Sequence, residues 1–261
     1  MTAPDIQEMF PAERQGRIVE LLKEQRAVRV ASLSDLLGVS EMTIRRDLER
    51  LANDGILSRT HGGAILRQRM VEEPRYVLNV RAHTEEKERI SRAAARLIKQ
   101  GETVFLGSGT TASQLLAHVD PQVEARIVTH NLGVVTSAHG TSLDVVLIGG
   151  QYRPHTNSVE GALAVEIVSR FHAPLFILGC DGLSLEEGLT TPSLGLAGVE
   201  RAMLRQTRGE VVVLADHSKI GVVGDAVICP LDDIQTIIVD DGVDGDVRDE
   251  MRRRGIRVVV A

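Results

Sequence analysis

The chain contains 261 residues, of which 43% are hydrophobic, and carries a formal net charge of −6. This length exceeds one typical domain and predicts two folded domains. The two cysteines, Cys180 and Cys229, offer no disulfide framework and no metal-binding spacing, so we expect buried core thiols in a reducing compartment.

Residues 1–10 lack a basic cluster followed by an apolar core, and no apolar run is long enough to span a bilayer. We therefore expect a cytoplasmic protein that does not associate with membranes.

Apolar residues at helical spacing predict three helices near the N-terminus, the first from Glu13 to Glu24. The inward positions are Ile18, Leu21 and Leu22 in the first helix, Leu33, Leu36 and Leu37 in the second, and Ile44, Leu48 and Leu51 in the third. Gly38 tolerates the left-handed backbone of a tight turn between the last two helices, and the Ser40 hydroxyl can cap the third. This arrangement is typical of a helix-turn-helix.

The third helix presents polar side chains opposite its apolar stripe, namely Glu41, Thr43, Arg45, Arg46 and Glu49. Arginine is the side chain best shaped to bind guanine or a phosphate. Two exposed arginines alone would more simply be a solvated surface. After this helix, Ile56 to Thr60 and Ala64 to Leu66 form two β-prone runs joined by His61-Gly62-Gly63, which predicts a hairpin wing with Arg59 and His61 near its tip. The wing and the turn together favour DNA binding.

The segment Val39-Ser40-Glu41-Met42-Thr43-Ile44-Arg45-Arg46-Asp47-Leu48, followed by Arg59-Thr60-His61-Gly62-Gly63-Ala64, resembles the N-terminal domain of the DeoR/GlpR family of bacterial transcription regulators. The resemblance covers Glu13 to Leu66. It implies a repressor, or occasionally an activator, of sugar-metabolism genes that releases its double-stranded operator DNA on binding a phosphorylated sugar or related metabolite. The residues expected to contact DNA are Ser40, Thr43, Arg45, Arg46, Arg50, Arg59 and His61.

The distribution of charge limits how this DNA binding can work. Residues 1–75 hold 12 basic and 12 acidic side chains, whereas the remainder holds 18 basic and 24 acidic ones. Attraction to phosphate must therefore come from a local basic face made by Arg45, Arg46, Arg50 and Arg59. One short helix gives little affinity, so we expect a homo-oligomer, a dimer or tetramer, that binds repeated half-sites.

The periodic pattern is lost from Arg67 to His83, a stretch that includes Pro74. We therefore predict a DNA-binding domain at residues 13–68, a linker at 69–83 and a larger domain at 84–261. Thr84 to Gln100 reads as a helix. Strand-like runs then alternate with helices, which predicts an α/β fold with a Rossmann-like parallel sheet. These runs are Thr103 to Leu106, Ile127 to Thr129, Asp144 to Ile148, Leu175 to Cys180, Val211 to Ala215, Thr236 to Val239 and Arg257 to Val260.

A glycine-rich and hydroxyl-rich turn, Gly107-Ser108-Gly109-Thr110-Thr111, follows the first of these strands. At a helix N-terminus it offers free amides, hydroxyls and the positive end of the helix dipole, which suits a phosphate. Such turns also occur for geometric reasons alone. It is neither a Walker loop, because no lysine follows the glycine, nor a nucleophile elbow, because Leu106 stands where that motif needs glycine.

Polar clusters follow the other strands, where ligands of parallel sheets bind. They are Thr129-His130-Asn131, Gly149-Gly150-Gln151-Tyr152-Arg153, Gly179-Cys180-Asp181-Gly182 and Ala215-Asp216-His217-Ser218-Lys219. Asp181 could accept from a sugar hydroxyl and Lys219 could bind a phosphate. Turn formation or helix capping is the alternative for Asp181 and Asp216. The neighbours Asp216, His217 and Ser218 cannot form a catalytic triad. His130 and His217 are isolated from any second ligand, so no metal and no cofactor is expected.

The region from Gly107 to Lys219 also resembles ribose-5-phosphate isomerase, whose phosphate loop is similar and whose late strand ends in Ala-Asp-x-Ser-Lys. In an ungapped alignment the catalytic lysine of the isomerase falls near Thr191 and its first aspartate near Leu178, whereas Asp181 and Glu200 keep carboxylates. We therefore expect no catalytic residues and no enzyme, but a binding site made of Gly107, Ser108, Gly109, Thr110, Thr111, Asn131, Asp181 and Lys219. The alternatives are an active sugar-phosphate isomerase-like enzyme fused to a DNA-binding domain, and an architectural DNA-binding protein without an effector.

Overall fold

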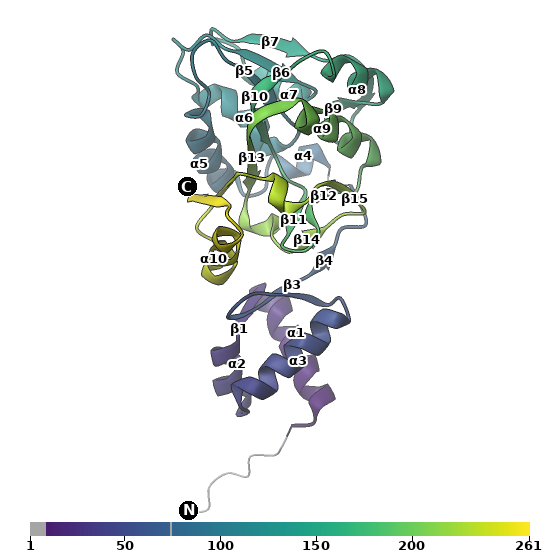
Figure 1. Ribbon diagram of the computed structural model, residues 1–261, viewed down its shortest axis with the longest axis vertical. Helices are drawn as coiled ribbons and strands as arrows, with labels where there is room; N and C mark the ends of the chain where they lie inside the picture. The colour runs from purple at the N-terminus through teal and green to yellow at the C-terminus, as the bar shows by residue number, and fades with distance from the viewer. Residues whose placement is uncertain (1–8, 74) are drawn as a thin grey trace, which may run out of the picture. The chain divides into compact units, whose positions relative to one another are not determined.

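A computed structural model describes residues 9–73 and 75–261 of the chain (Figure 1). Pro74 and residues 1–8, on which the linker and targeting predictions partly rest, lie outside the described residues. The chain divides into two compact units. The N-terminal unit comprises Met1–Gln68 with Asp244–Glu250, and the sheet unit comprises Arg69–Val243 with Met251–Ala261. The domain boundaries at 13–68, 69–83 and 84–261 stay a prediction. Within the described ranges, no helix is both long and apolar enough to cross a bilayer.

Over the described residues 9–68, the N-terminal unit contains three helices and a three-stranded antiparallel sheet in the order β1-β3-β2. The helices and the wing hairpin agree with the sequence-based prediction, but strand β1, only three residues long, was not predicted. A strand that short is too brief to show a period of two. The bounds are α1 Pro11–Gln25, β1 Ala27–Arg29, α2 Val30–Leu37, α3 Glu41–Asn53, β2 Leu57–Arg59 and β3 Gly63–Leu66.

The apolar faces of the three helices share one core with the strands. Ile18, Leu33, Ile44 and Leu48 are all buried there. Leu36 is 63% exposed, so its prediction as an inward residue is wrong. Helix α2 has only eight residues, and it meets the core through Val30 and Leu33, with Leu37 partly buried against it.

The turn before α3 forms as predicted. Gly38 adopts the left-handed conformation with φ at 65°, and the Ser40 hydroxyl accepts a hydrogen bond from the Thr43 amide at 3.2 Å. The glycine permits the sharp change of direction, and the serine satisfies one of the amides that a helix start leaves unpaired. These two residues fix where α3 begins.

The sheet unit is built on a seven-stranded sheet in the order β17-β16-β13-β10-β5-β6-β7. All six neighbouring pairs are parallel. All seven predicted strands are present, and the α/β class is confirmed. Their bounds are β5 Thr103–Leu106, β6 Arg126–Thr129, β7 Asp144–Leu147, β10 Ala173–Leu178, β13 Thr207–Ala215, β16 Thr236–Val239 and β17 Arg257–Val260.

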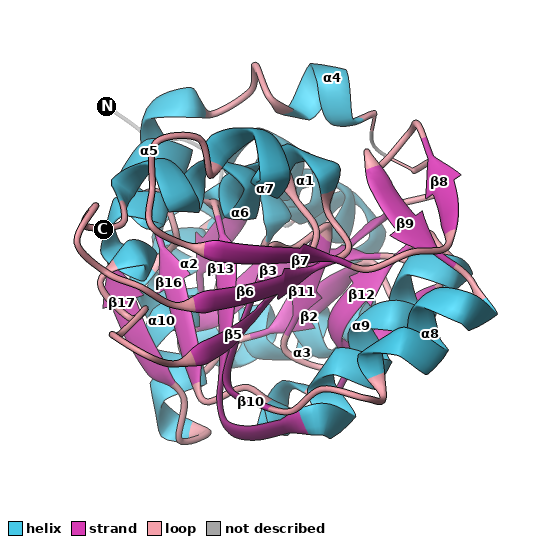
Figure 2. Cartoon of the chain, turned by 90° about the horizontal axis from the view of Figure 1, so that it is seen from above, coloured by secondary structure: helices cyan, strands magenta, loops and turns pink. Residues whose placement is uncertain are grey.

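Helices cover both faces of this sheet (Figure 2). On one face lie α5 Thr84–Ala95, α6 Thr110–Leu115 and α7 Leu132–Ser137, and on the other α9 Leu194–Gln206 with α8 Ala162–Val168 beside it. Helix α5 ends at Ala95, five residues before the predicted Gln100. Its side chains Ile90 and Ala94 join alternate residues of the central strands, such as Ile177 and Val212, in one buried core.

Shorter elements complete the chain. They are β4 Gln68–Arg69, α4 Tyr76–Asn79, η1 Leu116–His118, β8 Gln151–Arg153, β9 Ser158–Glu160, β11 Gly182–Ser184, β12 Gly188–Thr191, η2 His217–Lys219, β14 Val222–Val223, β15 Ala226–Cys229, η3 Leu231–Asp233 and α10 Gly245–Arg253. Strands β11, β12 and β15 form a separate antiparallel sheet. Both cysteines are free thiols, Cys229 buried as expected and Cys180 only half-buried.

Part of the segment predicted as a linker belongs to the sheet unit and packs on its helices. The Tyr76 hydroxyl donates to the hydroxyl of Ser113 in α6 at 3.2 Å. The ammonium group of Lys87, a side chain that is buried in α5, donates to the carbonyls of Asn79 and Ala82. Helix α4 is thus held at both ends, by Ser113 of α6 and by Lys87 of α5.

Candidate functional site

The outward face of α3 carries the arginines predicted to contact DNA. Arg45, Arg46 and Arg50 are exposed, and Thr43 is half-buried at the first turn. Arg45 forms an ion pair with Glu41 one turn earlier, at 3.3 Å, on the exposed surface. Such a surface pair is weak, so both side chains stay available to a partner. The exposed surface of this short helix therefore presents three guanidinium groups.

A buried ion pair anchors the opposite side of α3 to α1. The Asp47 carboxylate accepts hydrogen bonds from Arg14 Nε at 2.5 Å and from Gln15 Nε2 at 2.9 Å. Both members of the Arg14–Asp47 pair are more than nine-tenths buried. Asp47 is not among the predicted functional residues, although its spacing of three from Ile44 places it on the inward stripe. The pair fixes the rotation of α3 about its axis, and with it the direction of the exposed arginines.

The wing places its two predicted DNA contacts differently. His61 is exposed in the turn between β2 and β3. Arg59 is half-buried, and its Nη1 donates to the backbone carbonyl of Arg45 in α3 at 3.1 Å. Burial and the nearby charge of Arg45 lower the pKa of Arg59. Arg59 therefore ties the wing to α3. Its contact with DNA, like that of Ser40, Thr43, Arg45, Arg46, Arg50 and His61, stays a prediction.

The second candidate site, called the strand-end site below, lies at the carboxyl ends of four adjacent strands, β13, β10, β5 and β6. Parallel strands end at one edge of a sheet, so the polar clusters that follow them lie side by side. This edge brings together the Gly107–Thr111 loop, Asn131, Asp181 and Lys219, as predicted. The remaining cluster follows the edge strand β7, where Arg153 forms an ion pair with Glu73 at 2.9 Å.

Glu200 of α9 holds the start of the Gly107–Thr111 loop. Its Oε1 accepts from the Ser108 amide at 3.1 Å and from the Ser108 hydroxyl at 2.6 Å. The side chain is 1% exposed. His130 Nε2 lies 3.7 Å from the same oxygen and has no hydrogen-bond partner among the described residues. Glu200 and His130 are thus part of the site, although neither is among the predicted binding residues.

The loop can pass this close to β10 only because of its glycines. Gly109 has φ at +107°, and a Cβ there would lie 3.1 Å from the Cα of Gly179. The Gly179 amide donates to the Ser108 carbonyl at 2.9 Å, which joins the two strand ends. The first-turn amides of α6, which follow directly, lack partners within the helix. A glycine-rich turn therefore places free amides at the edge of the sheet.

Asn131 is fully buried and supports the loop from the side of β6. Its Nδ2 donates to the Gly109 carbonyl at 3.2 Å and to the Ser113 hydroxyl at 3.1 Å, and its Oδ1 accepts from the Gly133 amide at 2.9 Å. These bonds occupy the side-chain amide and cap α7. Asn131 positions the loop, and a direct contact with a ligand stays a prediction.

Asp181 and Lys219 bring opposite charges to the other side of the loop. Burial raises the pKa of Asp181 to about 6, and the charge of Glu200 adds to the effect. The hydrogen bond from Thr191 Oγ1, at 2.8 Å, and the charge of Lys219 act against it. Lys219 is half-buried in η2. The isomerase alignment predicts its catalytic lysine near Thr191, and the structure shows this hydroxyl bonded to the remaining carboxylate.

The prediction that His130 and His217 are isolated is wrong. His130 lies beside Glu200, and His217 Nδ1 lies 2.8 Å from Asp240 Oδ2, with the ring of His83 against it. These partners are 23 or more residues away along the chain, so only the fold brings them near. A spacing search that considers adjacent residues cannot find them.

A cavity of about 470 Å³ adjoins the loop on the side of α4 and α5. Thr110 and Ser113 of α6 line it, together with Tyr76 and Val80 from the segment before α5 and Glu88 from α5. This cavity therefore lies between the candidate binding loop and the segment that leads back to the N-terminal unit.

Two family models match the chain. One describes a DeoR-like helix-turn-helix domain and matches residues 14–69, and the other describes the DeoR C-terminal sensor domain and matches residues 82–241. Together with the α3 face and the strand-end site, they define a transcriptional regulator that carries a sensor domain, not an enzyme.

Curated relatives match over nearly the whole length. The regulator GlpR of Haloferax volcanii is 34% identical over 96% of this chain and 98% of its own, and GolR of Listeria innocua is 30% identical over 97% and 100%. The glycerol-3-phosphate regulon repressor of Escherichia coli K12 is 34% identical over 82% of this chain and 84% of its own. The chain belongs to the DeoR family of transcriptional regulators.

Among solved structures, ribose 5-phosphate isomerase A of Methanocaldococcus jannaschii is similar over 53% of this chain and 55% of its own, with 16% identity and a TM-score of 0.40.

Proposed function

We propose that the protein is a repressor of carbohydrate-metabolism genes, and that its affinity for operator DNA falls when the sheet unit binds a phosphorylated sugar. The observation that carries the proposal is the strand-end site. It combines a glycine-rich loop held by Glu200, a lysine and a titratable aspartate at one edge of the sheet. The name of the Escherichia coli relative, a glycerol-3-phosphate regulon repressor, points to the same class of effector.

The DNA-binding half of the proposal rests on α3. Its exposed guanidinium groups, Arg45, Arg46 and Arg50, project from a helix that the Arg14–Asp47 pair and the Ser40 cap hold in place. In helix-turn-helix proteins the second helix of the motif enters the major groove and its N-terminal residues contact base edges. We assign Thr43, Arg45 and Arg46 to contacts with bases and nearby phosphates, and Arg50 to contacts with the phosphate backbone. His61 is the expected DNA contact from the wing.

The effector half rests on chemistry that favours an anion carrying hydroxyl groups. Free amides of the loop, the hydroxyls of Thr110 and Thr111 and the ammonium of Lys219 suit a phosphate. Asp181 accepts from a sugar hydroxyl. The buried Nε2 of His130 has no hydrogen-bond partner among the described residues, and an orphaned buried nitrogen is what a site for a bound ligand or water leaves behind.

The segment before α5 is the route by which we propose that the effector acts on DNA binding. Tyr76 is hydrogen-bonded to Ser113, directly behind the loop, and Tyr76 also lines the cavity beside Thr110. Coupling needs an effector that prefers one arrangement of this segment over another, typically by about 1 to 3 kcal/mol.

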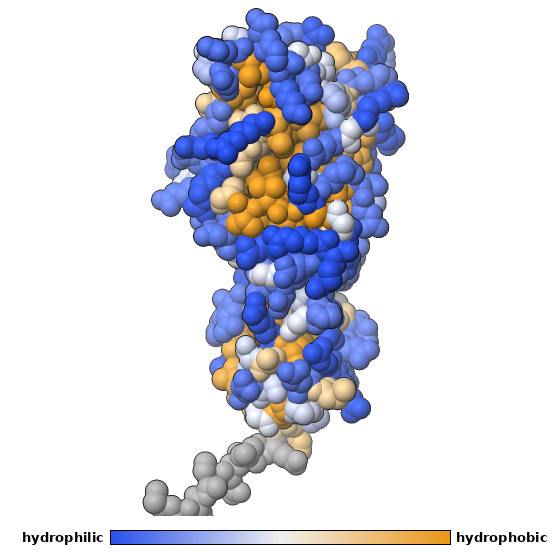
Figure 3. All heavy atoms as spheres, turned by 60° about the vertical axis from the view of Figure 1, so that its left-hand side comes forward, coloured by the Kyte–Doolittle hydropathy of each residue, from blue (hydrophilic) through white to orange (hydrophobic). Residues whose placement is uncertain are grey.

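We propose that the protein acts as a homo-oligomer, a dimer or tetramer. Repeated half-sites compensate for the small affinity of one helix. Apolar residues gather on one face of the sheet unit among hydrophilic ones (Figure 3), and an apolar area with a polar rim is typical of an interaction surface.

The first experiment is a thermal-shift screen of the full chain. The panel contains glycerol 3-phosphate, ribose 5-phosphate and fructose 6-phosphate, each beside its unphosphorylated counterpart. A ligand that binds only the folded protein raises its melting temperature, by an amount that grows with its concentration. Stabilisation by one phosphorylated compound and not by its counterpart supports the proposal. No shift across phosphorylated compounds of three to six carbons contradicts the effector half.

The DNA half has a separate test. Duplexes selected from a random library by the full chain should converge on one sequence with repeated half-sites. That duplex should be released when the stabilising compound is added. Selection without convergence would instead indicate an architectural DNA-binding protein.

A further inference from the structure

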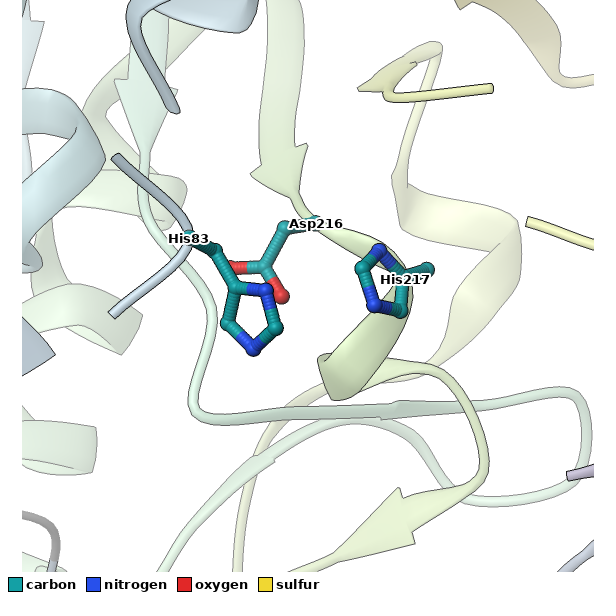
Figure 4. A group of neighbouring side chains, drawn as sticks. All are labelled: His83, Asp216 and His217. Carbon is teal, nitrogen blue, oxygen red and sulfur yellow. The ribbon is translucent and has the colours of Figure 1, made fainter. Parts of the chain in front are cut away.

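Three side chains that can bind a metal converge beside η2 from two parts of the sheet unit that are far apart in the sequence. His83 precedes α5, Asp216 follows the last residue of β13, and His217 begins η2 (Figure 4). Their ligand atoms all lie within 4.8 Å of one another. Figure 4 shows the Asp216 carboxylate extending from the backbone after β13 toward the His83 ring, with the His217 ring on the other side of Asp216.

Asp240 fixes the orientation of His217. Its Oδ2 lies 2.8 Å from His217 Nδ1 and accepts from the Gly242 amide at 3.0 Å, and its Oδ1 accepts from the His217 amide at 2.6 Å. A carboxylate accepts hydrogen bonds, so it places the ring proton on Nδ1 and leaves the lone pair of Nε2 free. In metal sites a carboxylate commonly holds the ligating histidine in this way.

The backbone near these residues makes room for that arrangement. A Cβ on Gly242 would lie 2.7 Å from Asp240 Oδ2 and 2.8 Å from His217 Nδ1, so a larger residue would push the pair apart. His83 has φ at 52° and ψ at 45°, a left-handed conformation that is uncommon for residues other than glycine. Strained residues of this kind gather at ligand-binding sites.

His83 occupies the position before α5 where a serine, threonine or aspartate would normally cap the helix. Its side chain makes no cap bond to α5. Instead the ring stands edge-on to His217, with ring centroids 4.8 Å apart and an angle of 85° between the planes. The side chain therefore points toward the cluster.

Asp216 supplies the negative charge. It is 1% exposed, and both hydrogen bonds from Ser218 end on Oδ1, which leaves Oδ2 without one among the described residues. Capping η2 and balancing the nearby charges of Lys87 and Lys219 would account for Asp216 alone. It would not account for two imidazoles facing the same carboxylate, one of them held by a second carboxylate.

The geometry points to a divalent transition-metal site, with His83, Asp216 and His217 as ligands to Zn²⁺ and Asp240 as the residue that positions His217. Two imidazoles and one carboxylate are a ligand set that Zn²⁺ accepts, with the fourth position open. Bonds of about 2.1 Å at tetrahedral angles place ligand atoms about 3.4 Å apart, so small side-chain rotations close the site around an ion. Mg²⁺ and Ca²⁺ prefer oxygen ligands and do not fit it. This inference does not depend on the identity of the effector.

The test is a Zn²⁺ titration of the full chain, without an affinity tag and stripped of metal, in competition with a chromophoric chelator. We expect one Zn²⁺ per chain, unaffected by excess Mg²⁺, and a higher melting temperature with Zn²⁺ than without it. His83→Gln and His217→Asn should each weaken binding at least about tenfold, and Asp240→Asn by about tenfold to a hundredfold, because His217 loses the carboxylate that orients its ring.

The control is His139→Gln, which removes an exposed histidine away from the cluster and should leave Zn²⁺ binding unchanged. Circular dichroism in chelator checks that each variant folds, and either histidine variant suffices if the other does not. The inference is overturned if wild-type protein binds no Zn²⁺ in the competition, or if folded His83→Gln or His217→Asn binds it as tightly as His139→Gln does.

Discussion

Ser108 donates both its amide and its hydroxyl to one oxygen of Glu200, although the two residues are 92 positions apart. These two hydrogen bonds to a buried carboxylate link the candidate binding loop to α9, on the other face of the sheet. The shape of the loop therefore depends on a helix that contributes no residue to it.

Glu200→Ala should lower the free energy of unfolding of the sheet unit by about 1 to 3 kcal/mol, because it leaves the buried Ser108 amide and hydroxyl without an acceptor. Glu200→Gln keeps an acceptor oxygen at the same place and should cost less. Denaturant unfolding of both variants measures the difference. Equal stability of Glu200→Ala and wild type would show that the bonds to Ser108 contribute nothing.

Asp47→Ala should destabilise the N-terminal unit by about 3 to 5 kcal/mol, because Arg14 then keeps a buried charge without its partner. Operator binding should be lost at the temperature where this unit unfolds, while the melting of the sheet unit is unchanged. Glu41→Ala is the matched control, since it removes an exposed ion pair with Arg45 worth at most about 1 kcal/mol. Calorimetry of the full chain separates the two transitions.

Arg46→Ala should weaken operator binding by about 1 to 3 kcal/mol, the value of one base or phosphate contact. Effector-induced stabilisation should persist, because the substituted side chain is exposed on α3. Arg17→Ala, which removes an exposed arginine from α1, is the control and should bind the operator normally. Fluorescence anisotropy at two salt concentrations provides the measurement, and equal affinities of the two variants would exclude Arg46 from the interface.

Lys219→Ala should bind operator normally but fail to release it, because the charge that meets the phosphate is gone. The compound found in the thermal-shift screen should no longer stabilise this variant. Lys99→Ala removes an exposed lysine elsewhere on the sheet unit and should respond as wild type does. A normal response of Lys219→Ala would place the phosphate elsewhere.

Asp181 should make the protein less stable as the pH rises from about 4 to about 6. Its pKa in the folded protein, about 6, is higher than the value of about 3.9 in an unfolded chain, so the folded state holds its proton more tightly. Stability linked to that proton is complete below pH 4 and is lost through pH 6. Asp181→Asn lacks this loss, so its melting temperature relative to wild type should increase across that range. Asp232→Asn, on the exposed surface, is the control, and a constant difference for Asp181→Asn would contradict the shift.

Local patterns predict the framework of both units but not the contacts that complete the sites. The stripe of Ile44 and Leu48 predicts α3, and apolar runs predict every strand of the parallel sheet, because burial on both faces leaves a strong signal. Glu200, His83 and Asp240 are different. Each lies in a stretch whose own pattern shows only a helix or a turn, and each acquires its partner through strand order, which the sequence of one chain does not display.

The sheet order also has a consequence for how the chain folds during synthesis. Strand β10 is the middle strand, between β5 and β13, so the two halves of the sheet cannot join before residue 178 has been made. The core of the N-terminal helices closes within the first 66 residues. Chains fold from the N-terminus as they emerge, and parallel pairing between distant segments is slow. A growing chain can thus form the helix-turn-helix, with α3, before it can form the seven-stranded sheet. Under the proposed function, an unfinished chain would bind DNA but lack the effector site that releases it.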